Sequence, residues 1–106
     1  MNEQEKIISK MIKAKVKQKD PFADVILFGS HARGQANTTS DWDILILINK
    51  QDRNRLIERE FRGLLFDIEL EIGEPISTFV FSKSDWEQRY VVTPLYQNVK
   101  REGIYL

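Results

Sequence analysis

The stretch Gly29–Asp43, GSHARGQANTTSDWD, lies between two short apolar runs and decides how the chain can fold. The run before it covers residues 24–28, and the run after it covers residues 43–48. Both have the length of a buried strand, and the second is continuous enough to be central in a sheet. We expect the polar stretch between them to be a loop, with one helical turn after Ser30.

The segments on either side of this strand–loop–strand unit predict helices. Residues 3–19 place apolar side chains three and four positions apart, on one face of a helix that ends at Asp20-Pro21. The members of this predicted apolar face are Ile7, Ile8, Met11, Ile12 and Val16. Residues 53–72 fit one long helix, although residues 66–72 also alternate as a strand would. Length favours the helix, because only Gly63 interrupts it.

The last third of the chain continues the alternation of strands and helices. The predicted elements are a strand over residues 76–81, a short helix capped by Ser84-x-x-Glu87, a helix from Thr93-Pro94 to Gly103, and an edge strand or frayed end over residues 104–106. We also expect a turn over residues 49–52. This order predicts an α/β or α+β fold, one small sheet covered by helices, in a single domain spanning residues 1–106.

The composition points to a soluble protein without disulfides. Lys+Arg and Asp+Glu both number 16, so the formal net charge is zero, which argues against a general nucleic-acid binder. The absence of cysteine excludes a disulfide framework, a thiolate zinc site and a cysteine nucleophile. The polar N-terminal segment is unlike a secretory signal, and no apolar run approaches the ~20 residues of a membrane helix. We therefore expect a cytoplasmic protein with no membrane partner.

The polar stretch carries the residues from which chemistry is expected. Side chains at i and i+2 of a strand share a face, so Asp41 and Asp43 would present two carboxylates together. Their repulsion would be relieved by a hard cation, and Mg²⁺ uses one or two carboxylates plus substrate phosphates. The alternative for an isolated Asp-x-Asp is a helix cap or strand-entry turn. Here Gly29 and Ser30 follow a buried strand and offer backbone and hydroxyl groups to an anion, and the guanidinium of Arg33 suits phosphate oxygens.

These residues resemble a known family. Gly29-Ser30, ten residues and then Asp41-x-Asp43 match the Gly-Ser-x10-Asp-x-Asp signature of the DNA polymerase beta-like nucleotidyltransferases. The fuller GSHARG…SDWDILI is similar to their minimal nucleotidyltransferase branch of small, stand-alone prokaryotic proteins. The resemblance implies a small mixed sheet flanked by helices and transfer of a nucleoside monophosphate, from ATP or another nucleoside triphosphate, to an acceptor hydroxyl.

The resemblance also implies site residues and partners. Gly29 and Ser30 would bind the triphosphate with help from Arg33, and Asp41 and Asp43 would be catalytic and hold Mg²⁺. Family members of this size often accompany a HEPN-domain protein, and some act as antitoxins by adenylylating it. The edge at residues 104–106 and the small core are also compatible with a homodimer.

The chain departs from the family where a third carboxylate is usual. The aligned position is Ser77, and no Asp or Glu lies between Ile76 and Ser84. Glu74 could reach in from the preceding turn, and the strand reading of residues 66–72 would offer the acids at 67, 69 and 71 instead. Failing these, the chain would be a nucleotide-binding or partner-binding module of the same fold with impaired catalysis. A third reading makes the motif a coincidence in a small α/β domain.

The remaining aromatic and ionisable residues give weaker predictions. His31 is expected to be an exposed bystander at a variable loop position. Trp42 and Trp86 are expected to pack in the core rather than stack on bases.

Overall fold

A computed structural model describes residues 1–37, 39–49 and 53–106 of the chain. In chain order, the elements of these residues are α1 (Glu3–Lys19), β1 (Asp24–Phe28), α2 (Ser30–Arg33), β2 (Trp42–Ile48), α3 (Arg55–Ile72), β3 (Ile76–Ser82), α4 (Lys83–Gln88), α5 (Pro94–Glu102) and β4 (Ile104–Tyr105). The sequence-based elements are all present, so the prediction of an α+β fold is confirmed. Residues 50–52 of the expected turn lie outside the described residues.

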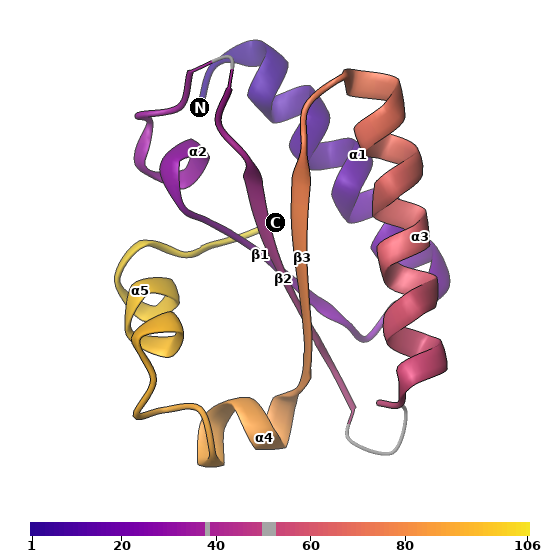
Figure 1. Ribbon diagram of the computed structural model, residues 1–106, viewed down its shortest axis with the longest axis vertical. Helices are drawn as coiled ribbons and strands as arrows, with labels where there is room; N and C mark the ends of the chain where they lie inside the picture. Colours follow the sequence, from indigo (N-terminus) through magenta and orange to yellow (C-terminus); the bar gives the residue numbers. More distant parts are fainter. Residues whose placement is uncertain (38, 50–52) are drawn as a thin grey trace.

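The four strands form one mixed sheet in the order β3-β2-β1-β4 (Figure 1). β1 runs antiparallel to both β2 and β4, whereas β2 and β3 are parallel. β2 is therefore central, as its unbroken apolar run predicts. The short pairing of β4 with β1 confirms the edge strand expected after Gly103.

Helices cover both faces of this sheet. α1 and α3 lie on one face, and α4 and α5 pack on the other (Figure 1). Alternate residues of β2 divide between the two cores: Ile44 and Ile46 contact the α1–α3 layer, and Leu45 and Leu47 contact the α4–α5 layer. None of the described helices is long and apolar enough to cross a lipid bilayer.

α3 settles the ambiguity of residues 53–72 in favour of the helix. Its side chains Phe61, Leu65 and Ile68 are buried at helical spacing, and Asn54 caps the first turn by accepting from the Ile57 N–H. The strand reading of residues 66–72 is wrong, because a helix that ends at Gly73 buries this apolar face in one layer with α1.

Two local predictions also need correction. α4 is capped by Ser82 rather than Ser84. The Ser82 hydroxyl accepts a hydrogen bond from the Asp85 N–H at 3.1 Å. Because Ser82 is buried, this bond gives its hydroxyl a partner where water does not reach. On α1, the expected apolar residue Ile7 is 59% exposed, since the buried stripe runs through Ile8, Ile12 and Val16.

Candidate active site

Three strand ends meet at one end of the sheet. In the strand register, Asp43 of β2 pairs with Phe28, the last residue of β1, on one side. On its other side Asp43 pairs with Ser77, near the start of β3. The antiparallel and parallel pairings thus bring the GSHARG loop, the Asp-x-Asp pair and Ser77 together, although they lie far apart in sequence.

Gly29 makes the closest approach between the loop and the carboxylates. It caps α2 with φ of +78°, a region that residues with a Cβ rarely adopt. A Cβ at this position would lie 2.1 Å from Asp43 Oδ2 and 3.1 Å from Asp43 Cγ, so the Asp43 side chain would have to move to admit one. Glycine at position 29 therefore lets the turn before Ser30 lie directly against the Asp43 carboxylate where that carboxylate now stands.

The two aspartates differ in their surroundings. Asp41 is exposed and accepts a long hydrogen bond of 3.4 Å from the Ser77 hydroxyl to its Oδ2. Asp43 is partly buried, and this burial raises the pKa of its carboxyl, as do the negative charges of Asp41 and Glu102 to a smaller degree. The positive charge of Arg33 offsets these effects on the Asp43 pKa only in part.

The oxygen atoms of Asp41, Asp43 and Ser77 fit a hard cation whose remaining ligands come from a bound molecule. Two carboxylates and a neighbouring hydroxyl supply oxygen ligands, and a cation between the carboxylates would relieve their repulsion. The described residues contain no group of three or more His, Asp or Glu side chains arranged to hold a metal ion on their own. Phosphate oxygens from a nucleotide would have to complete such a site.

Arg33 lies at the end of α2, but its guanidinium is held by the protein. Its Nη1 donates to Glu102 Oε2 at 2.8 Å, and its Nε donates to Gln35 Oε1 at 3.0 Å. Glu102, at the end of α5, is thus both the partner of Arg33 and a source of the raised Asp43 pKa. The sequence offered no signal for Glu102, because it follows Arg33 by 69 positions.

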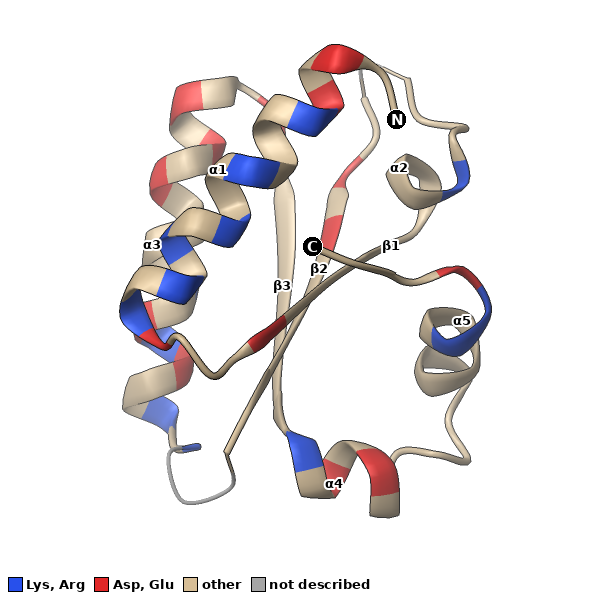
Figure 2. Ribbon diagram, turned by 180° about the vertical axis from the view of Figure 1, so that it is seen from behind, with Lys and Arg blue, Asp and Glu red and all other residues tan. Residues whose placement is uncertain are grey.

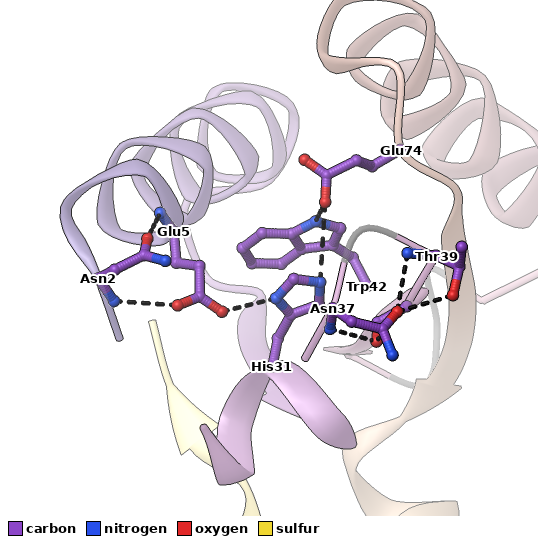
Figure 3. A network of polar contacts seen from close by, with 8 residues as sticks. Asn2, Glu5, His31, Asn37, Thr39, Trp42 and Glu74 are labelled. Carbon is purple, nitrogen blue, oxygen red and sulfur yellow. Dashed lines mark hydrogen bonds and ion pairs between the residues drawn. The ribbon is translucent and has the colours of Figure 1, made fainter. Parts of the chain in front are cut away.

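The prediction for His31 is wrong, because the side chain is buried instead of exposed. It is 3% exposed, its ring stacks on Trp42 with 3.8 Å between centroids, and its Nδ1 lies 2.7 Å from Glu5 Oε2 (Figure 3). Its Nε2 is buried without a hydrogen-bond partner among the described residues. The contact with Glu5, in the first turn of α1, offsets the cost of burying the imidazole.

Glu74 does not replace the missing third carboxylate. Its Oε1 accepts from Trp42 Nε1 at 3.3 Å and lies 3.9 Å from His31 Nε2, as Figure 3 shows. Trp42 faces the α1–α3 layer, whereas Asp43 faces the opposite side of the sheet. Trp42 and Trp86 are both buried in the core, as expected. The acids of α3 point elsewhere too; Glu69, for example, accepts from the Ile76 N–H.

The predicted site residues therefore converge in part. Gly29, Asp41, Asp43 and Ser77 lie together at one sheet end, with Ser30 beginning α2 beside them. Arg33 belongs to the same loop but is paired with Glu102.

Comparison with known proteins agrees with this geometry. A family model described as a nucleotidyltransferase domain matches residues 9–105. One solved structure of similar fold is the crystal structure of a toxin-antitoxin with AMP-PNP; it is 20% identical, with a TM-score of 0.65, over 91% of this chain and 69% of that one. None of the curated proteins compared matches the chain.

Proposed function

This chain belongs to the nucleotidyltransferase-domain family, and from that premise we propose that it is a minimal nucleotidyltransferase that transfers AMP from ATP to a hydroxyl of a partner protein. One observation carries the proposal. The turn that precedes α2 lies against the Asp43 carboxylate with no room for a side chain at Gly29. A phosphate-binding turn and a metal-binding carboxylate are needed at this separation to hold a nucleotide and its cation together.

The residues have separate roles in this proposal. The Gly29–Ser30 turn and the Ser30 hydroxyl bind the triphosphate. The guanidinium of Arg33 contributes a positive charge to the phosphates once its ion pair with Glu102 is broken. Asp41 and Asp43 hold Mg²⁺, which when bound would neutralise phosphate charge and orient the reacting oxygens. The Ser77 hydroxyl orients Asp41 through the hydrogen bond between them.

The transfer forms one bond and breaks one. The acceptor oxygen bonds to the α-phosphorus of ATP, and the bond from that phosphorus to the oxygen shared with the β-phosphate breaks. Pyrophosphate leaves with the electron pair, and the hydroxyl proton passes to water, since Ser77 is no base at neutral pH. The chain's contribution is to place and align the two oxygens.

The acceptor and its setting are part of the proposal. We place the acceptor on a HEPN-type partner that this chain inactivates as an antitoxin in the cytoplasm. One observation supports this: the solved structure of similar fold is a toxin-antitoxin.

Ser77 favours a second candidate function. A hydroxyl stands where a third carboxylate would lie beside Asp43. In that alternative the chain binds ATP and Mg²⁺ and neutralises its partner by contact, without turnover.

The test is a calorimetric titration of ATP into the chain with and without Mg²⁺. We expect Mg²⁺-dependent binding that disappears in Asp43→Asn and persists in Asp67→Asn, a matched change at an exposed position of α3. Absence of binding in the unaltered chain would overturn the nucleotide site. Binding without pyrophosphate release in the presence of the HEPN-type partner would favour the second candidate over the first.

A further inference from the structure

A groove runs between α3 and the edge strand β3 and ends at the candidate active site. It has a volume of about 660 Å³, and the residues used below are Arg59, Arg62, Phe66, Glu69, Ser77 and Thr78. We call it the α3–β3 groove. Its Ser77 end touches the site directly, because the Ser77 hydroxyl donates to Asp41.

The floor of the groove is a sheet edge with unused backbone groups. The Trp42 N–H donates to the Pro75 carbonyl at 2.9 Å, so by strand alternation Ser77 also faces β2, and Ile76, Thr78 and Val80 face outward. The Ile76 N–H is taken by Glu69 at 2.7 Å, and Arg53 donates weakly to the Val80 carbonyl at 3.4 Å. Among the described residues, no side chain hydrogen-bonds the N–H or C=O of Thr78, a residue that is 8% exposed in total. Such an edge is a template for an added strand.

The wall of the groove is basic and partly apolar. Arg59 and Arg62 are exposed and make no ion pair with any described residue. Figure 2 shows that most of the basic positions lie on α1 and α3, the two helices of this face. Phe66, one turn beyond Arg62, is 52% exposed. The wall therefore complements a segment with acidic and apolar side chains.

We infer that the α3–β3 groove binds an extended, acidic segment of a partner protein, which adds as a strand to β3 and brings a hydroxyl to Asp41 and Asp43. The segment pairs with the free backbone groups of Thr78 and places Asp or Glu side chains opposite Arg59 and Arg62. The hydroxyl stands at its Ser77 end. Binding of the segment is argued from the groove alone, whereas its delivery of a hydroxyl to the active site rests on the proposed function.

Two other occupants fit the groove less well. Single-stranded RNA gains affinity from an excess of positive charge and from aromatic stacking, but the chain has no net charge. A second copy pairing through the same edge would bring Arg59 and Arg62 against their own equivalents, because a two-fold interface matches a patch with itself. Like charges opposite one another disfavour that dimer.

The experiment is a selection from a displayed library of random 14-residue peptides on the full chain, without ATP or Mg²⁺. We expect enriched peptides with Asp or Glu at alternate positions, and slowed exchange of the Thr78 amide hydrogen when a synthetic copy binds. Affinity should fall about tenfold or more in the double variant Arg59→Glu/Arg62→Glu. It should stay unchanged in Lys10→Glu/Lys13→Glu, a matched reversal on exposed positions of α1.

Other outcomes overturn the inference. These are enrichment that does not depend on the two arginines, binding of oligouridylate but of no peptide, or self-association of the free chain that Thr78→Pro abolishes. A Lys-bearing version of the peptide should regain affinity for the Arg59→Glu/Arg62→Glu variant, which separates charge pairing from a folding defect.

Failure of the groove and failure of the proposed transfer are distinguishable. Peptide binding without transfer to a hydroxyl at its Ser77 end would leave the docking intact and count against delivery and transfer. ATP binding without peptide binding would overturn the groove alone.

Discussion

The Asp43 carboxylate occupies the space in which a side chain on residue 29 would begin, since a Cβ there would lie 2.1 Å from Asp43 Oδ2. The glycine of the loop and the second aspartate of the motif are thus one packing unit. The loop between them returns the chain to this contact.

Gly29→Ala should destabilise the chain and displace Asp43. The φ of +78° with ψ of −160° lies in a region essentially confined to glycine and costs alanine about 1–3 kcal/mol, and the overlap with the carboxylate adds to this cost until Asp43 moves. Gly34→Ala is the comparison, because Gly34 is a left-handed glycine with φ of +72°, ψ of 23° and no atom within 4 Å of its Cβ position. Urea unfolding should show a larger loss of stability for Gly29→Ala than for Gly34→Ala. Equal losses would contradict the extra cost expected at Gly29.

Asp43→Asn should stabilise the nucleotide-free chain while abolishing Mg²⁺-dependent ATP binding. The folded chain raises the pKa of Asp43, so the folded state holds a proton at pH values where the unfolded state has lost it. Stability from this group is full below the ordinary carboxyl pKa and is lost as pH rises through the raised one. At neutral pH we expect an increase in Tm of about 2–4 °C for the variant, allowing for solvent screening.

The pH series tests the sign of this effect. The difference in Tm between Asp43→Asn and the unaltered chain should grow as pH rises through the raised pKa of the Asp43 carboxyl and then level off. A difference that shrinks with rising pH would contradict the raised pKa.

Ser77→Asp should restore a third carboxylate beside Asp43. The parallel register places position 77 next to Asp43, and its side chain already reaches Asp41. Three carboxylates should lower the Tm of the metal-free chain by repulsion and tighten Mg²⁺ binding about tenfold or more. Ser77→Asn is nearly isosteric without the charge, so a similar gain in that variant would assign the effect to shape.

Glu102→Gln should strengthen ATP binding. The change loosens the 2.8 Å ion pair that holds Arg33 and removes a negative charge that acts on Asp43. We expect affinity for ATP with Mg²⁺ to rise about twofold to fivefold by calorimetry, within the range of one partly exposed ion pair. Most of the gain should be lost in an Arg33→Ala background. A gain that persists there would come from the lost negative charge alone, and Glu71→Gln serves as the exposed control.

Local patterns in the sequence predict the elements and half of the site. The strands around GSHARG are apolar runs of strand length, and α3 follows from its spacing and its Gly73 stop. The Asp-x-Asp pair and Gly29 could be found from the sequence because each belongs to a short local motif. The strand register then brings Ser77 beside Asp43, where the family resemblance expects the third acid.

The contacts that could not be predicted from the sequence join residues far apart in the chain. His31 meets Glu5 across 26 positions, and Arg33 meets Glu102 across 69. No periodicity marks such pairs, because each depends on how whole helices pack against the sheet. The choice between Ser82 and Ser84 as the α4 cap also depends on burial, which the order of serines does not reveal.

The carboxylate of Glu5 joins two structures that would otherwise be independent. Its Oε1 accepts from the Asn2 N–H at 2.9 Å in the α1 cap, and its Oε2 contacts His31 at 2.7 Å in α2. A helix of one turn such as α2 has almost no stability of its own. Fraying of the first turn of α1 must therefore loosen the loop, and the two segments should open as one cooperative unit. The loop thus inherits its order from residues that no nucleotide would touch.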